Sequence, residues 1–308
     1  MFDLYLPIAE VSVNAPLLVG LGALVGFISG LFGIGGGFLM TPVLVLLGIP
    51  PAVAVASMSN HVAASSMSSV ISYGRTRAVD FRMGGVLAGG GAVGSILGVE
   101  LFRWLRLLGQ ADLVVAFSYL IFLGVIGSLM LTESLGAILR RRRNQPPPPR
   151  RDRRPPWLYG LPFKVRFPRS RLYISVIPPL ALGAFVGVLS AIMGVGGGFI
   201  LVPAMVYVLR MPANVVVGTS LFQIIITTAL TGVLQAGRNQ TVDILLASLL
   251  LVGGVLGAQF GARASSRFRA EELRAVLAFI VLLVGLRMGL GLFLRPDEPF
   301  VLMAGTGG

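Results

Sequence analysis

The chain has 308 residues but no cysteine and only one histidine. Without cysteine it can form no disulfide, use no thiolate as a nucleophile and offer no sulfur ligand to a metal. One histidine and 12 carboxylates leave little material for a buried metal site. We therefore expect neither a metal nor a cofactor.

Charge is also scarce. Only 12% of the residues are charged, against about a quarter in an ordinary soluble domain. Hydrophobic residues make up 55% of the chain, and the mean hydropathy is +0.88. A soluble protein of this size cannot cover so much apolar surface with so few charges. The composition predicts a polytopic membrane protein, and an all-α one, because an open sheet would leave backbone groups unpaired in lipid.

The basic residues are concentrated in one segment. The net charge is +13, and 12 of the 25 basic residues lie between 140 and 171, where Asp152 is the only acid. Basic, proline-rich segments can bind nucleic acid, but a cytoplasmic loop that obeys the positive-inside rule explains this one more simply. We expect the segment to rest on anionic lipid headgroups, and we expect no nucleic-acid partner.

Apolar blocks divide the rest of the chain. The first residues, Met1–Pro16, lack the basic region of a signal peptide and are expected to form a short interfacial segment. Most blocks have about the 20 residues that a membrane-spanning helix needs. They cover residues 16–49, 52–72, 81–101, 112–132, 173–209, 213–235, 243–262 and 273–294.

The two longest blocks contain a glycine motif that breaks a helix. The motifs are Gly33-Ile34-Gly35-Gly36-Gly37 and Gly194-Val195-Gly196-Gly197-Gly198, and each is followed by a proline. Successive glycines and a proline disfavour a helix interior. We therefore predict that each block forms two half-helices joined by a non-helical turn.

Such a turn can bind an anion. A half-helix that begins inside the membrane presents free backbone N–H groups and a partial positive charge. The alternative is that the glycines serve only close helix packing. The candidate substrate-binding glycines are Gly35, Gly36, Gly37, Gly196, Gly197 and Gly198.

The two motifs belong to an internal repeat. They lie 161 residues apart, and a later run of glycines, Gly90-Gly91 with Gly94 and Gly98, recurs 163 residues on. Matches that keep their register in this way indicate two homologous halves of four segments each. We place the halves at 1–135 and 172–308, with 136–171 as the basic, proline-rich linker.

The arginines favour an inverted repeat. The loop after block 52–72 carries Arg75, Arg77 and Arg82, whereas the equivalent loop of the second half has only Arg238. The loop after block 243–262 is rich in arginine instead. Equivalent loops therefore prefer opposite sides of the membrane. Inversion makes the two long blocks re-entrant and puts both termini outside the cytoplasm.

A few polar residues lie inside the blocks. His61 is a candidate for proton coupling, although a neutral histidine satisfied by a neighbouring helix is the alternative. An offset of 161 aligns it with Phe222, so we expect any role to be asymmetric. Asp80 and Asp243 are expected only to cap helices. The remaining polar candidates can line a substrate path or join helices, and they are Asn60, Thr219, Ser220 and Gln223.

The paired glycine motifs, the run Gly218-Thr219-Ser220-Leu221 and the four-plus-four layout resemble the TauE/SafE family, also called the 4-toluene sulfonate uptake permeases. The resemblance implies secondary transport of small sulfur-containing anions, such as sulfite, sulfonates or sulfoacetate, by a multi-pass protein of the bacterial inner membrane. The first half departs from the pattern at Met58, where the second half has Thr219.

Two other functions are weighed against transport. A non-transporting assembly subunit could use the basic linker as a docking arm. An intramembrane hydrolase would need a serine near His61, but Ser57 and Ser65 lie on the same predicted helix, and no Gly-x-Ser-x-Gly elbow occurs. We therefore expect a transporter and no enzyme.

Overall fold

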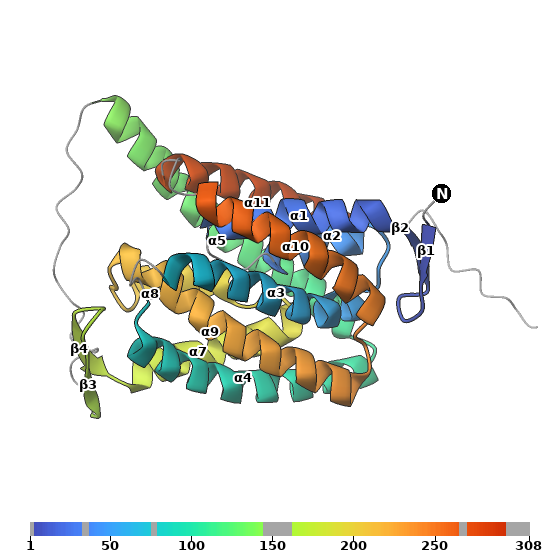
Figure 1. The fold of residues 1–308 in the computed structure, drawn as a ribbon, viewed down its shortest axis with the longest axis horizontal. Coiled ribbons are helices and arrows are strands. Elements are labelled where there is room, and N and C mark those ends of the chain that lie inside the picture. Colours follow the sequence, from blue (N-terminus) through green and yellow to red (C-terminus); the bar gives the residue numbers. More distant parts are fainter. Residues whose placement is uncertain (1–2, 33–36, 75–78, 144–161, 265–269, 294–308) are drawn as a thin grey trace, which may run out of the picture.

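The computed structural model describes residues 3–32, 37–74, 79–143, 162–264 and 270–293. Most of the described chain is helical, and five of its helices are long and apolar enough to cross a membrane. The predicted class, an all-α polytopic membrane protein, is confirmed. The helices are α1 (Ala15–Phe32), α2 (Gly37–Leu46), α3 (Pro51–Gly74), α4 (Phe81–Leu107), α5 (Ala111–Arg142), α7 (Ile177–Met193), α8 (Gly198–Tyr207), α9 (Ala213–Leu234), the short π-helix η1 (Gln235–Asn239), α10 (Ile244–Ala264) and α11 (Ala270–Phe293) (Figure 1).

The second long block is broken where the glycine motif predicts. Helix α7 ends at Met193, α8 begins at Gly198, and the turn between them has positive φ angles of 68°, 74° and 75° at Gly194, Gly196 and Gly197. Side chains rarely tolerate such angles, so glycine is required here. The pieces are unequal, because α7 has 17 residues and α8 has 10. Helices α1 and α2 have 18 and 10, and residues 33–36 between them lie outside the described residues.

Glycine lets helices of the two predicted halves meet backbone to backbone. Helix α1 packs along α10, and α4 packs along α7 (Figure 1). A β-carbon added at Gly26 would overlap the carbonyl of Gly254, and one at Gly94 would overlap the carbonyl of Ala184. Both contacts are therefore closer than any side chain permits. They join equivalent elements, since α1 corresponds to α7 and α10 to α4 in the predicted repeat.

The remaining helices pair with their own counterparts. Helix α3 packs on α9, and α5 packs on α11. In the middle of the bundle, the rings of Phe38 and Phe199 stack with centroids 4.8 Å apart and planes 7° from parallel. Each of these two residues directly follows the first helical glycine of its motif. The two broken blocks therefore touch at equivalent residues.

Two β-hairpins, which the sequence analysis did not foresee, lie at opposite ends of the bundle (Figure 1). Strands β1 (Asp3–Leu6) and β2 (Val11–Asn14) precede α1, and strands β3 (Lys164–Phe167) and β4 (Leu172–Ser175) precede α7. Both hairpins are antiparallel. The expected interfacial segment at the start of the chain is thus a folded hairpin.

Each hairpin binds the capping aspartate of the other predicted half. Asp80 accepts from the backbone N–H groups of the first turn of α4, and Asp243 does the same for α10, so both predicted caps are confirmed. The second carboxylate oxygen of Asp80 accepts from the N–H and hydroxyl of Ser170, at 2.9 and 2.6 Å. That of Asp243 accepts from the N–H of Ile8 at 3.1 Å.

Two parts of the basic segment form regular structure. Helix α5 continues to Arg142, past the predicted boundary at 135, and β3 begins at Lys164. Arg169 donates to the carbonyl of Val79 at 2.6 Å and lies over the ring of Phe81. Arg169 therefore links the β3–β4 hairpin to the start of α4.

Labelling of single cysteines tests the topology. The chain has no native cysteine, so Tyr5→Cys, Gln240→Cys and Phe163→Cys each create one exposed thiol. In an inverted repeat, an impermeant maleimide added to intact cells labels the first two and reaches Phe163→Cys only after permeabilisation. Labelling of Phe163→Cys in intact cells, with protection of Tyr5→Cys, would reverse the proposed orientation. Equal labelling of all three would exclude hairpins on opposite membrane faces.

Removal of the two capping carboxylates should have unequal effects. Asp80→Ala removes a helix cap and leaves the N–H and hydroxyl of Ser170 without their acceptor. Asp243→Ala removes a helix cap and leaves only the N–H of Ile8 without its acceptor. An unsatisfied buried donor costs about 1–3 kcal/mol, and a lost cap about 1 kcal/mol. The thermal unfolding temperature in detergent should therefore fall in both variants, and it should fall further in Asp80→Ala. An equal or reversed order would contradict the greater importance of the Ser170 contact.

Candidate functional site

The two glycine motifs meet inside the bundle. A β-carbon added at Gly37 would lie 2.6 Å from the carbonyl oxygen of Gly194 and 2.6 Å from the side chain of Val62 on α3. One added at Gly196 would lie 3.1 Å from a methyl group of Thr228 on α9 and would also overlap Val62. The described parts of both motifs therefore lie against each other, with α3 and α9 as their walls. Gly35 and Gly36 lie outside the described residues.

The second turn presents the start of a helix. The N–H groups of Gly198 and Phe199 lie in the first turn of α8, where a helix has no internal acceptor. The opposite charge, at the end of α7, is partly neutralised, because the hydroxyl of Tyr119 donates to the carbonyl of Met193 at 2.6 Å. The turn therefore has backbone N–H groups available to an anion, while the carbonyl oxygen of Met193 just before it is already hydrogen-bonded.

Helices α3 and α9 carry many of the buried polar side chains of the bundle. Several buried polar atoms of the bundle have no hydrogen-bond partner in the described structure, among them both ring nitrogens of His61 and Oε1 of Gln223. Unpaired buried polar atoms are costly and are typical of sites that bind a ligand or water. The buried polar residues of the two helices are Ser57, Ser59, His61, Ser65, Ser66, Ser68 and Ser69 on α3 and Thr219, Ser220, Gln223, Thr227, Thr228 and Thr231 on α9.

His61 and Gln223 occupy matching places. The ring of His61 lies against Gly254 of α10, and the amide of Gln223 lies against Gly91 of α4. Those two glycines are equivalent in the predicted repeat. The structural counterpart of His61 is therefore Gln223, and its alignment with Phe222 is wrong. Phe222 packs edge-on against Phe81, with centroids 5.3 Å apart.

Thr219 also has a counterpart that the sequence alignment missed. Its hydroxyl accepts from the N–H of Asp80 at 3.0 Å, and the hydroxyl of Ser57 accepts from the N–H of Asp243 at the same distance. The counterpart of Thr219 is thus Ser57, and the departure expected at Met58 is not a loss of polarity. Both hydroxyls hold the start of a helix from the opposite half.

The other two polar candidates differ in their contacts. The hydroxyl of Ser220 donates to the carbonyl of Val217 on its own helix at 2.9 Å. Asn60 is half-buried, and its side-chain amide lies against Gly232 of α9. Asn60 and Gln223 are therefore the candidates whose polar atoms are least engaged with the backbone.

Two other features bear on the chemistry. No cluster of three or more histidine, aspartate or glutamate side chains that could hold a metal occurs among the described residues. A groove between α5 and α8, lined by Met130, Glu133, Pro203 and Tyr207, lies apart from the glycine turns. The polar interior is therefore separate from this groove.

Comparison with known protein families matches residues 18–288 to the family described as Sulfite exporter TauE/SafE. The chain belongs to the TauE/SafE sulfite exporter family. The match covers all the helices that form the two glycine turns and the polar faces, so the resemblance drawn from the motifs is confirmed. This TauE/SafE protein is therefore a multi-pass membrane transporter by family.

Two bacterial relatives match over most of their length. The chain is 28% identical over 274 residues to a probable membrane transporter protein, YjnA, of Bacillus subtilis, covering 88% of this chain and 98% of the relative. It is 28% identical to a probable membrane transporter protein of Xylella fastidiosa, covering 87% and 92%. A plant relative, the Sulfite exporter TauE/SafE family protein 3 of Arabidopsis thaliana, is 30% identical over 39% of this chain and 26% of its own. No solved structure matches significantly.

Proposed function

We propose that this TauE/SafE transporter is a secondary carrier of small sulfur-containing anions of the sulfite, sulfonate or sulfoacetate type. One observation carries the proposal: Gly37 lies against the second glycine turn inside the bundle, where α2 and α8 begin, with Val62 of α3 and Thr228 of α9 alongside. The printed name of the family supports sulfite as the first anion to test. Proposed ligands are the backbone at Gly35–Gly37 and Gly196–Gly198, with Asn60 and Gln223 beside them. Thr219 and Ser220 line the wall.

The proposed site binds an anion without a buried cation. Among the described residues, no buried side chain is a lysine or an arginine. Recognition would then rest on backbone N–H groups, a helix N-terminus and neutral donors. This chemistry suits a carrier, because binding must be favourable enough for entry and weak enough for release.

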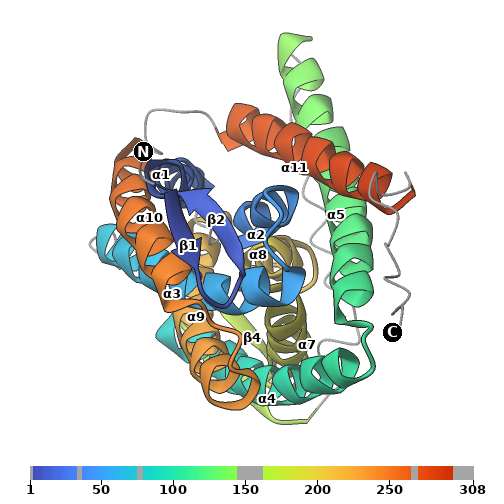
Figure 2. The same ribbon diagram turned by 90° about the vertical axis from the view of Figure 1, so that its right-hand side faces the viewer.

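The proposed topology is an inverted repeat in a bacterial inner membrane, with the β3–β4 end in the cytoplasm. The location of equivalent hairpins at opposite ends of the bundle supports inversion (Figure 1), and the arginine-rich segment 140–171 supports the orientation. In this topology the basic linker faces the anionic lipids of the cytoplasmic leaflet. The view along the bundle has β1 and β2 in front of the helices, as expected for an outer face (Figure 2).

This conformation is closed. Gly37, Gly196 and Gln223 are all buried, so an anion cannot reach the turns without a movement of helices. Alternating access by rocking of one part of the bundle against another is the usual solution in transporters built from inverted repeats.

Flux measurements test the substrate and the site together. Proteoliposomes loaded with labelled sulfite should show protein-dependent flux, and Gly37→Leu combined with Gly197→Leu should lower it by about tenfold or more, because both glycines are in close contact and overpacking costs about 1–3 kcal/mol. Gly89→Leu is the matched control, since nothing lies within 4 Å of a β-carbon added there. Unchanged flux in the double variant would refute the site. Absence of flux with sulfite, sulfonate and sulfoacetate in the parent protein would refute the substrate class.

Replacement of His61 tests proton coupling. His61→Gln keeps a polar side chain of similar length but cannot carry a proton, so stimulation of flux by an imposed pH gradient should disappear while exchange without a gradient persists. Ser69→Ala is the control on the same helix, because its hydroxyl donates only within α3. Full stimulation in His61→Gln would show that the proton travels by another route.

A further inference from the structure

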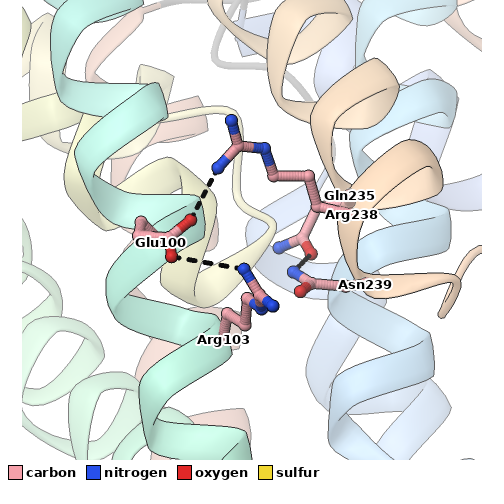
Figure 3. A network of polar contacts seen from close by, with 5 residues as sticks. All are labelled: Glu100, Arg103, Gln235, Arg238 and Asn239. Carbon is pink, nitrogen blue, oxygen red and sulfur yellow. Dashed lines mark hydrogen bonds and ion pairs between the residues drawn. The ribbon is translucent and has the colours of Figure 1, made fainter.

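Two sets of polar contacts lie at η1: an ion-pair group at the surface and a buried amide pair (Figure 3). The ion-pair group lies at the end of the bundle that carries β1 and β2, where Arg238 of η1 forms an ion pair with Glu100 of α4 at 2.8 Å. The side chains are exposed by 55% and 39%. The contact joins two helices that are not neighbours in sequence.

Further contacts involve η1 and the amide pair. Arg106 of α4 donates to the carbonyl of Asn239 at 2.7 Å, so α4 holds η1 at two points. The amide of Asn239 donates to the side-chain oxygen of Gln235, and both residues are buried. Since η1 is a π-helix, a form that occurs often at functional sites, its hydrogen bonding differs from that of α9 before it.

The last contact reaches the end of α7. The side-chain amide of Gln235 donates to the carbonyl of Ala191 at 3.2 Å. Carbonyls in the last turn of a helix have no internal partner, and Ala191 lies three residues before Gly194, where the turn begins. Gln235 therefore fixes the segment from which the glycine turn starts.

We propose that Gln235 is a positioning residue for the second glycine turn, and that the Glu100–Arg238 ion pair, by holding η1 against α4, keeps this end of the pathway closed. Opening on this side requires α4 and η1 to separate. That separation withdraws Gln235 from Ala191, so access and the shape of the turn change together. The proposal concerns access and holds whichever anion is carried.

Side-specific accessibility of a buried thiol tests the proposal. The reporter is Ser190→Cys on α7, a nearly isosteric change at a buried residue whose hydroxyl has no partner in the described structure. A membrane-impermeant methanethiosulfonate is added to intact cells or to inside-out vesicles, and the labelling rate is measured. The readout needs no substrate, so its failure is distinct from a failure of sulfite transport.

Two variants should open this end of the pathway. Glu100→Gln should raise the labelling rate from the β1–β2 side by about threefold to fivefold, since an exposed ion pair shifts an equilibrium only modestly. Gln235→Leu should raise it by about tenfold or more, because it leaves Ala191 and Asn239 without their buried partner. Neither should raise labelling from the opposite side.

Each variant has a matched control. Arg103→Gln removes the weaker contact of Glu100, 3.5 Å long and within α4, and should leave the rate unchanged. Thr231→Val removes a buried hydroxyl that donates only within α9 and should also have no effect. The proposal is overturned if labelling does not increase, if it increases equally from both sides, or if the controls match the variants.

Discussion

The bundle depends on contacts between helix backbones that only glycine permits. Helices α1 and α10 meet at Gly26 and Gly254, and α4 meets α7 where Gly94 faces Ala184. In lipid there is no hydrophobic force to bring helices together, so close packing must supply the attraction. Because each of these contacts joins one predicted half to the other, the longer piece of each broken helix packs mainly on the opposite half. The short pieces α2 and α8 pack on α3 and α9 of their own halves, so the glycine turns lie where the two kinds of contact meet.

The sequence predicted the features that composition and periodicity control. The apolar blocks correspond to helices, and the helix break at Gly194–Gly198 follows from the conformation of glycine. The hairpins were missed because four-residue strands, rich in charged residues in β3, carry no strong alternating pattern. The extension of α5 to Arg142 was missed because the run of arginines was assigned to the loop.

The polar site was harder to predict, because helix register matters at the level of one residue. The repeat has an offset of 161 residues at the glycine motifs and 163 at the later glycines. The contacts of Ser57 and Thr219 show that the offset between α3 and α9 lies between these two values. A shift of one residue turns a helical side chain by about 100°. An error of one residue in the alignment therefore paired His61 with Phe222 and not with Gln223. Gln235 gave no signal in the sequence, since its role depends on the π-helix.

His61 and Gln223 occupy equivalent places in the two predicted halves but differ in chemistry. Both side chains lie against a glycine of the same predicted stripe, so the fold treats the two halves alike at this point. Their chemistry differs, because an imidazole ring can carry a proton and an amide cannot. The ends of the bundle differ in the same way: Asp80 binds its hairpin by two hydrogen bonds, and Asp243 binds its hairpin by one. In a secondary carrier the gradients of the substrate and of any coupled ion set the net direction of transport. Differences of this kind, placed on a matched backbone, let the two access states differ in stability and affinity.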